Sequence, residues 1–187
     1  YYSTKGEHEM IKEAFTAFGL MFGSDSYILE TPPSVDLEYD KQEITCLADN
    51  MYWEARNQST KGLIAVGYVT MNRVADHRYP YTVCEVVEQG PVRESWKTKG
   101  KYYPIKNRCQ FSWYCDGKGD DIPSADTDLY QLITAMAFKI YYASEGNDFT
   151  EGATHYHAHY VQPSWAQTKT MTVTIGDHIF YRWEILP

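Results

Sequence analysis

The spacing of apolar residues changes along the chain, and this change constrains the fold more than any other feature. Residues 40–55, 60–74 and 126–144 carry apolar side chains three and four positions apart, which predicts helices. Residues 150–187 instead alternate and are rich in β-branched side chains, and the runs 171–175 and 178–183 flank a Gly-Asp turn as in a β-hairpin. Helices followed by strands indicate an α+β fold.

Capping residues place the starts of these helices. Asp40 and Glu43 have the spacing of a capping box, and Thr82 with Glu85 opens a short helix to residue 89. Ser59 or Thr60 begins the helix that runs to Val74, and Ser124 or Asp126 caps the long helix that runs to about residue 144. The inner face of that long helix is predicted to consist of Leu129, Leu132, Ile133, Met136 and Ile140.

The first forty residues differ from the rest. Residues 7–22 predict an amphipathic helix, and Pro32 and Pro33 in the following stretch are typical of a linker. We therefore expect an N-terminal helical extension and linker over 1–40 and the main domain over 41–187. The extension is expected to pack on that domain or on a partner, if the protein is part of a larger chain or assembly.

Charge and length exclude several classes of protein. The 187 residues suit one main domain, and no apolar run approaches the ~20 residues of a membrane span. The net charge of −8 argues against a nucleic-acid binder. Residues 90–108 are an exception, because they carry +5 while the remainder carries −13. We expect a long basic loop there, which is either only solvated or contacts an anionic partner.

Four cysteines permit several states. Cys109 and Cys115 are close enough for a short loop disulfide, which leaves Cys46 to pair with Cys84. Four reduced thiols in a cytosolic protein are the alternative.

Seven blocks of sequence carry a resemblance. They are YWEAR, GLIAVGYVTMNRV, YPYTVCEVV, CQFSWYCDG, GATHYHA, PSWA and IGDHIFYR, in this order over about residues 43–183. This pattern resembles the cell-wall hydrolases of the spore cortex-lytic, SleB-type family. The resemblance implies a lysozyme-like α+β catalytic domain, mainly helical with a small C-terminal antiparallel sheet, that acts on the glycan strands of peptidoglycan. It implies no cofactor and no metal.

The resemblance also implies a catalytic acid, the glutamate of the first block, which is Glu54 here. Cleavage of a glycosidic bond needs a proton donor at the leaving oxygen, and an apolar wall raises a glutamate's pKa enough to keep it protonated. Trp53, Phe111 or Trp113 are candidates for that wall. Without the resemblance, Glu54 would read as a helix-surface carboxylate paired with Arg56 or Lys61.

No second carboxylate stands out in the sequence. Five are conceivable partners for Glu54: Asp49, Glu85, Asp116, Asp120 and Asp121. Members of the resembling family act as lytic transglycosylases, in which the muramic acid C6 hydroxyl attacks the anomeric carbon, so that one acid suffices. Hydrolysis by water, as in a muramidase, is the alternative.

Other residues of the blocks are candidates for a sugar-binding groove. We expect Thr154, His155 and Tyr156 on one wall, and Gln110, Ser112 and Trp113 on the facing wall, with Tyr181, Trp165 and His178 closing the groove or packing. In the alternative interpretation, Phe111 and Trp113 belong to the core and only Gln110 and Ser112 are exposed. Arg56 and Asn72 match the blocks and are either functional or structural.

Two hypotheses from other classes compete with glycan cleavage. His155, His157 and His159 alternate, so that on a strand they share one face and suit a zinc-dependent peptidoglycan peptidase. A non-catalytic wall-binding module is the other. Under each of these hypotheses the expected partner is peptidoglycan, with the basic loop 90–108 as a contact to an anionic wall. The expected location is outside the cytoplasm, in the periplasm, in the wall or secreted, or delivered to the bacterial wall by a phage.

Overall fold

A computed structural model describes residues 37–142 and 148–184, all within one compact unit, Asp36–Pro187. The predicted helix 7–22 lies outside the described residues. Four α-helices precede most of the strands: α2 (Leu37–Ala55), α3 (Thr60–Ala75), α4 (Val83–Val87) and α5 (Thr127–Tyr141). None of the helices described is long and apolar enough to cross a membrane.

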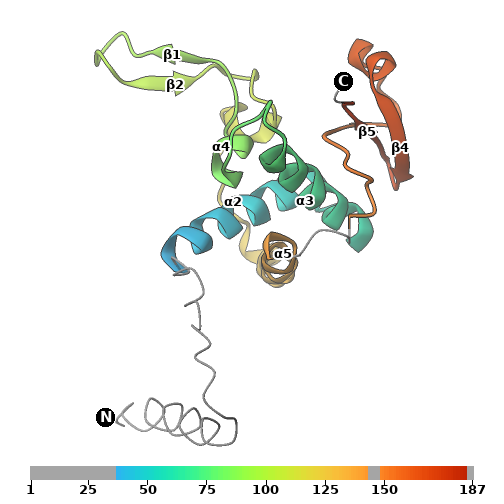
Figure 1. Cartoon of the computed structure of the whole chain (residues 1–187). Coiled ribbons are helices and arrows are strands. Elements are labelled where there is room, and N and C mark those ends of the chain that lie inside the picture. The colour runs from blue at the N-terminus through green and yellow to red at the C-terminus, as the bar shows by residue number, and fades with distance from the viewer. Residues whose placement is uncertain (1–36, 143–147, 185–187) are drawn as a thin grey trace, which may run out of the picture. The chain divides into compact units, whose positions relative to one another are not determined.

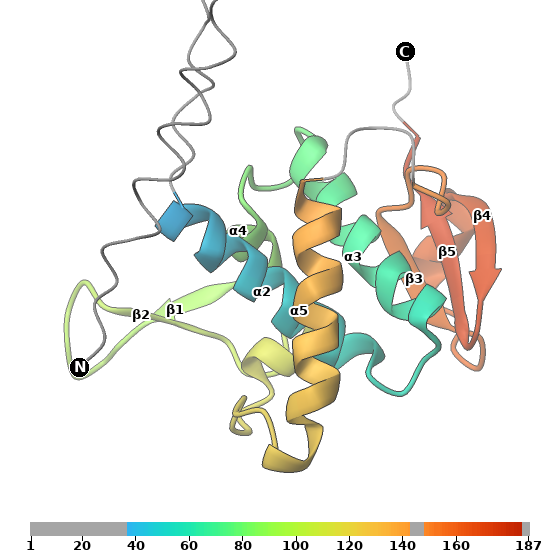
Figure 2. The ribbon, with the colours of Figure 1, turned by 90° about the horizontal axis from the view of Figure 1, so that it is seen from below.

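The helices pack around α2, which contacts α3, α4 and α5. Leu47, Met51 and Tyr52 of α2 are fully buried and pack against Val66 of α3 and Ile133 of α5 in the main hydrophobic core. In Figure 2, α5 crosses the end of α2 and α3 lies between these two helices and the sheet. The other face of α3 uses Ala65 and Val69 to cover Phe180 of the sheet, so α3 joins the two parts of the domain.

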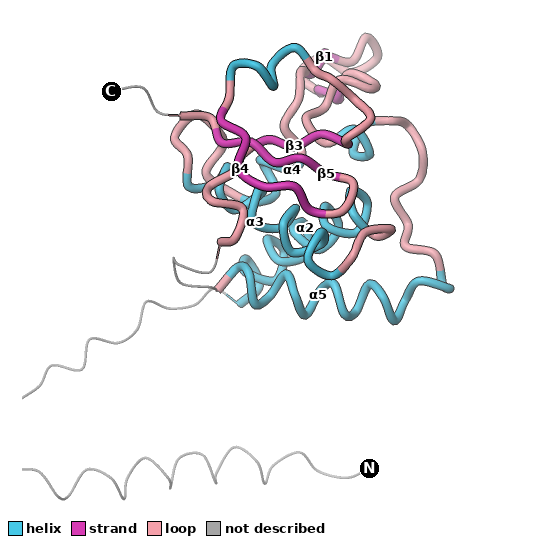
Figure 3. The backbone as a smooth tube through the Cα atoms, turned by 90° about the vertical axis from the view of Figure 1, so that its right-hand side faces the viewer, coloured by secondary structure: helices cyan, strands magenta, loops and turns pink. Residues whose placement is uncertain are grey.

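The sheet is antiparallel and has the strand order β3-β5-β4 (Figure 3, magenta). Its strands are β3 (His155–Ala158), β4 (Thr170–Ile175) and β5 (His178–Arg182). Strands β4 and β5 form the hairpin predicted from the sequence, with Gly176 in the left-handed region at φ 56°. A 3₁₀ helix, η3 (Ser164–Thr168), lies between β3 and β4. The mixture of helices and a small antiparallel sheet confirms the α+β prediction.

The basic segment is not the long loop that was predicted. Strands β1 (Val92–Glu94) and β2 (Tyr102–Pro104) pair antiparallel within it. Figure 1 shows this hairpin projecting from the α4 side of the domain, away from the β3-β5-β4 sheet. Strands β1 and β2 were not predicted because they bury no apolar face, so their sequence lacks the alternation of apolar residues that indicates a strand. Two 3₁₀ helices follow, η1 (Ser112–Cys115) and η2 (Ser124–Asp126).

Both disulfides form as the spacing suggested. Cys46 pairs with Cys84 across 38 residues and links α2 to α4, and Cys109 pairs with Cys115 across 6. No described cysteine is free, so the alternative of four reduced thiols is wrong for this structure.

The helix ends differ from the prediction in two places. Helix α2 starts at Leu37, before the supposed capping box. Glu43 bonds the backbone N–H of Val83, and Asp40 accepts the hydroxyl of Tyr142, so both carboxylates serve tertiary contacts instead of a cap. By contrast, α3 and α4 begin as predicted, with Ser59 and Thr82 accepting a backbone N–H from the first turn.

Helix α5 differs from the prediction on its inner face. Leu132 is 53% exposed, whereas Ile133, Ala137 and Ile140 are buried. Leu132 lies about 100° from Ile133 around the helix, which turns it away from α2. Asp126 precedes the helix but caps nothing with its side chain, because its carboxylate accepts the hydroxyl of Tyr52.

Candidate active site

Glu54 lies in the last turn of α2, one residue before the helix ends at Ala55. Its Oε2 accepts a hydrogen bond of 2.7 Å from the hydroxyl of Tyr156 on β3, where the helices meet the sheet. Burial raises the pKa of the Glu54 carboxyl, while the Tyr156 hydrogen bond and the charge of Arg73 lower it. Burial is the largest of these effects, so the carboxyl holds its proton to higher pH than a solvated glutamate does.

The surface alternative for Glu54 is wrong. The guanidinium of Arg56 lies over the rings of Trp53 and Tyr52, at 4.7 and 5.1 Å from their centroids. Lys61 lies over the ring of Phe149. Both cations are therefore occupied by aromatic faces, and Arg56 is a structural clamp at the end of α2 instead of a partner for Glu54.

Arg73 supplies the positive charge near Glu54. It is buried on α3, and its Nε donates to the backbone oxygen of Thr154 at 2.8 Å. Its guanidinium also lies over the ring of Phe111, at 4.8 Å from the centroid. Arg73 thus ties α3 to the start of β3 and stabilises the ionised form of Glu54 from a fixed position.

Sequence reasoning missed Arg73 as a site residue. A signal was present, because Arg73 follows Val66 by seven and Thr70 by three, which puts its side chain on the buried face of α3. A buried arginine is rare unless it is paired.

Tyr156 faces the helices from β3. Its ring packs against Phe180 and His178 of β5, with centroids 5.5 and 5.0 Å apart. Burial and the neighbouring carboxylate raise the pKa of the Tyr156 hydroxyl well above its ordinary value. The hydroxyl therefore stays protonated and acts as a fixed donor to Glu54.

His155, His157 and Tyr181 lie on the opposite face of the sheet, because side chains alternate along a strand, whereas His178 shares the face of Tyr156 and packs against its ring. His157 stacks on Tyr181 and shares a hydrogen bond of 3.0 Å with its hydroxyl, and His155 packs against Trp165. Tyr181 and His157 line a cavity of about 430 Å³ on that side. Of the predicted wall, only Tyr156 contacts Glu54, while Thr154 connects to the site through Arg73.

The three histidines do not converge. The two ring nitrogens of His157 contact the oxygen of Ala158 and the hydroxyl of Tyr181, while His159 lies beyond the strand beside Asp177. Across residues 37–142 and 148–184, no three His, Cys, Asp or Glu side chains are grouped as a metal ion requires.

The segment predicted as the facing wall of the groove divides into exposed polar and buried aromatic side chains, as the alternative interpretation expected. Gln110 and Ser112 are exposed, while Phe111 is buried and Trp113 is half-buried. The cause differs from the one expected, because this segment forms the 3₁₀ helix η1 and not a strand.

Trp113 has a structural task in the helical core. Its indole N–H donates to Asn50 at 3.0 Å, and the Asn50 amide donates in turn to the hydroxyl of Thr70. Its ring stacks near Trp53, with centroids 6.3 Å apart. Its role as a sugar platform stays a prediction.

Among the described residues, no second carboxylate influences the pKa of Glu54. Three of the five conceivable partners make contacts elsewhere: Asp49 accepts from Tyr130, Glu85 contacts Thr82, and Asp116 pairs with Lys118.

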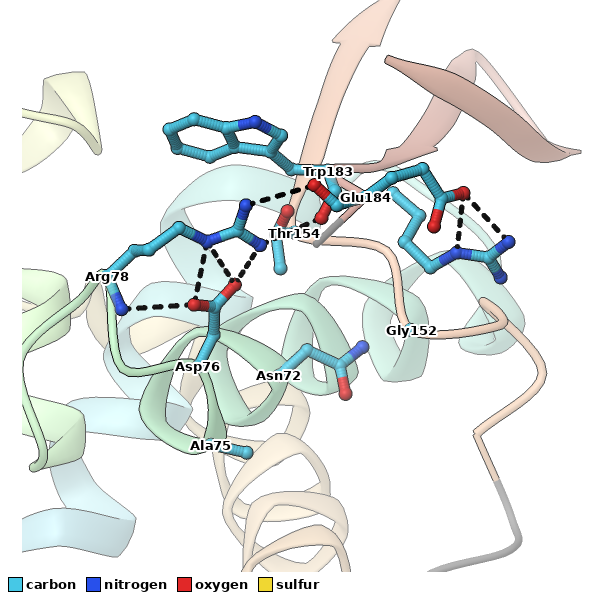
Figure 4. Close-up of a pocket in the computed structure, with 9 residues that line it drawn as sticks. Asn72, Ala75, Asp76, Arg78, Gly152, Thr154, Trp183 and Glu184 are labelled. Carbon is cyan, nitrogen blue, oxygen red and sulfur yellow. Dashed lines mark hydrogen bonds and ion pairs between the residues drawn. The ribbon is translucent and has the colours of Figure 1, made fainter. Parts of the chain in front are cut away.

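A cavity of about 350 Å³ lies at the C-terminal end of α3, beside the end of β5 (Figure 4). In it Arg78 lies between the carboxylate of Asp76 and the backbone oxygen of Trp183, with its guanidinium over the Trp183 ring. Asn72 donates to Asp148 and to the backbone oxygen of Ala153. Asn72 is thus structural, because it holds the segment that leads into β3.

Two solved structures are similar to this one in fold. The catalytic domain of the Bacillus cereus SleB protein matches the structure with a TM-score of 0.56 and 21% identity, over 84% of this chain and all of that one. The catalytic domain of the germination-specific lytic transglycosylase SleB from Bacillus anthracis matches with a TM-score of 0.54 and 22% identity, over 81% of this chain and all of that one. At this identity they show a shared fold.

No curated protein matches the chain. The sequence model of the Cell Wall Hydrolase family matches residues 57–181, which begin three residues after Glu54. That match spans well over half of the 187 residues. The chain therefore belongs to the Cell Wall Hydrolase family, with the SleB-type fold, and is an enzyme that acts on peptidoglycan.

Proposed function

We propose that this enzyme cleaves the bond between N-acetylmuramic acid and N-acetylglucosamine as a lytic transglycosylase, with Glu54 as its single acid and base. The observation that carries the proposal is the carboxyl of Glu54, whose pKa is raised by burial and which is held by the hydroxyl of Tyr156. A carboxyl with a raised pKa keeps its proton to higher pH than a solvated glutamate does, which suits a general acid.

In the first step Glu54 donates its proton to the glycosidic oxygen as the bond to the anomeric carbon breaks. Glu54 becomes a carboxylate, and the charge of Arg73 and the hydroxyl of Tyr156 stabilise that anion. Since both groups are fixed by the fold, they stabilise the ionised product of this step without reorganisation.

In the second step the C6 hydroxyl of the muramic acid attacks the anomeric carbon. The Glu54 carboxylate takes the proton of that hydroxyl, which restores the acid and leaves a 1,6-anhydro end. The nucleophile belongs to the substrate, so no second carboxylate is needed. This suits a site where no acidic group among the described residues influences the pKa of Glu54.

Attack by water, as in a muramidase, uses the same first step and is the nearest alternative. A zinc peptidase requires the three histidines to converge, and in the described structure they do not. A non-catalytic wall-binding module needs no acid, so that hypothesis does not account for a carboxyl with a raised pKa between α2 and β3.

We also propose that the enzyme works outside the cytoplasm, in the periplasm, in the wall or secreted, or is delivered to a bacterial wall by a phage. The two disulfides support this proposal, because such bonds persist in oxidising compartments.

Digestion of purified peptidoglycan followed by mass spectrometry of the products tests the reaction. Transglycosylation gives muropeptides lighter by one water than those of hydrolysis. Reducing ends would replace the proposal by the muramidase reaction, and released stem peptides would support a peptidase. A chelator should not alter the rate.

The variant Glu54→Gln tests the assignment of the acid. It keeps the size of the side chain and removes the proton, so that turnover should fall by a factor of roughly 10³ or more. Asp49→Asn is the matched control, because Asp49 is another partly buried carboxylate on α2 whose pKa burial raises. Undiminished activity of Glu54→Gln would refute the assignment.

A further inference from the structure

The hairpin β1–β2 has no role in the chemistry above, yet it combines a net positive charge with exposed aromatic rings. Residues 90–108 carry +5, while the rest of the chain carries −13. Trp96, at its tip, is 88% exposed, and Tyr102 and Tyr103 on β2 are 59% and 45% exposed. An exposed tryptophan beside several cations is typical of a binding surface.

The hairpin tip is ordered by its own hydrogen bonds. The hydroxyl of Ser95 accepts the backbone N–H groups of Lys97 and Thr98, and the backbone of Ser95 bonds the oxygen of Lys101 at 2.7 Å. The only acid of the segment, Glu94, accepts the N–H of Gly100 at 2.6 Å. The one negative charge is thus used to close the turn, and the lysines face solvent without an acidic partner within the described hairpin.

The base of the hairpin is fixed to the domain. The backbone of Ile105 bonds the oxygen of Pro91, and that of Asn107 bonds the oxygen of Cys115. Cys115 is held by its disulfide to Cys109. A hairpin clamped at its base in this way presents its tip at a defined position, which lowers the entropic cost of binding.

Aromatic rings and cations alternate along the hairpin. Lys97 lies over the ring of Trp96 at 5.1 Å, and Lys101 over that of Tyr103 at 5.3 Å. Arg93 is directly opposite Tyr103 in the register, so three groups share one face of the ribbon. Rings and positive charges thus occur both at the tip of the hairpin and on its strands, which suits a ligand that carries both sugar rings and carboxylates.

We infer that the hairpin β1–β2 is a second binding element for peptidoglycan, separate from Glu54, in which Trp96 contacts sugar rings and the lysines contact stem-peptide carboxylates. The identity of the polymer rests on the proposed function. The charge distribution supports it, because the acidic remainder of the domain is repelled by an anionic wall and the hairpin is attracted.

Binding of the full chain to insoluble peptidoglycan, freed of phosphate-bearing polymers, tests this inference. All proteins carry Glu54→Gln, so that binding is measured without turnover. Replacing Lys97, Lys99 and Lys101 by Gln should weaken binding about tenfold at low salt and less at high salt. Trp96→Ala should weaken it roughly three- to tenfold, with little dependence on salt.

Matched controls separate the hairpin from net charge and from exposed aromatics in general. Exchanging the exposed Lys41, Lys61 and Lys139 for Gln changes the net charge equally, and Tyr81→Ala removes a ring that is 75% exposed. Both controls should bind as the parent does. Unchanged melting temperatures show that each variant is folded.

Four results would overturn the inference. The first is unchanged binding of both hairpin variants, and the second is an equal loss of binding in the control variants. The third is a loss of binding that occurs only on walls that keep their phosphate polymers. The fourth is that binding to vesicles of phosphatidylglycerol and to vesicles of phosphatidylcholine depends equally on the hairpin. Failure of the proposed function can be told apart from failure of this inference. It would be seen in the peptidoglycan digestion products of the protein with intact Glu54, and it would leave these binding results unaffected.

Discussion

The raised pKa of the Glu54 carboxyl predicts that the proposed catalytic residue lowers the stability of the fold when it ionises. Burial disfavours the ionised carboxylate, and this effect outweighs the hydrogen bond of Tyr156 and the charge of Arg73. In the unfolded chain the same carboxyl titrates near its ordinary value of 4.5. Glu54→Gln removes this titration and nearly preserves the volume of the side chain.

The sign follows from proton binding. Between the ordinary pKa and the raised one, the folded protein holds the Glu54 proton more than the unfolded chain does, so the wild-type stability falls as the pH rises. Each unit of the raised pKa is worth about 1.4 kcal/mol. The free energy of unfolding of Glu54→Gln, less that of the wild type, should therefore rise through this window by about 1.4 kcal/mol per unit.

The amide group of the glutamine adds a cost that does not depend on pH. Its NH₂ needs an acceptor in a half-buried place, and an unmet donor costs about 1–3 kcal/mol. The absolute stability of the variant can therefore lie above or below that of the wild type. The slope of the difference against pH is the decisive quantity, because titrations common to both proteins cancel in it.

Urea denaturation followed by tryptophan fluorescence, at half-unit steps from pH 4 to 8 with the disulfides intact, measures this slope. Glu38→Gln is the control, because Glu38 is an exposed carboxylate on the same helix. Its difference from the wild type should change by no more than a few tenths of a kcal/mol, about the worth of an exposed charge at a helix start. A flat or falling difference for Glu54→Gln would refute the raised pKa.

Three further predictions concern the neighbours of Glu54 and the covalent frame. Tyr156→Phe removes the hydrogen bond that lowers the Glu54 pKa, so the alkaline limb of the kcat/KM profile should move to higher pH, and a downward shift would contradict this role. Arg73→Gln should move the same limb upward and cost about 3 kcal/mol of stability, while Arg73→Lys should leave the limb near its wild-type position, as pH profiles and urea melts can show. Replacing Cys46 and Cys84 together by Ser should cost about 4 kcal/mol of unfolding free energy, judged from a 38-residue separation, and a loss below about 1 kcal/mol would contradict this.

Local signals in the sequence were enough for most of the fold. Ser59 and Thr82 cap α3 and α4 as their spacing predicts, since a cap depends only on residues three positions away. Asp40 and Glu43 failed as a cap because their carboxylates are taken by Tyr142 and Val83, which lie 102 and 40 residues further along. No local pattern reports such contacts.

The site was predicted where a motif and a physical need coincided. Glu54 and Tyr156 were both named from the sequence, and they contact each other across 102 residues. The grouping of Tyr156 with His155 and Tyr181 was too broad. Alternation along β3 already puts Tyr156 on the face opposite to His155, and the register pairs His155 with Tyr181. Arg73 was missed because its partners lie on another element.

Burial and the two neighbours of Glu54, Arg73 and Tyr156, together suit this carboxyl to the two proposed roles of acid and base. Burial raises the pKa of the carboxyl, which favours the protonated acid that the first proposed step needs. Arg73 and Tyr156 lower the pKa and stabilise the carboxylate that the second proposed step needs. The two influences oppose each other, which suits a carboxyl that gives a proton in the first step of the proposed reaction and accepts one in the second. Changing either neighbour should therefore shift the pH of best activity before it abolishes activity, whereas changing Glu54 removes both steps at once.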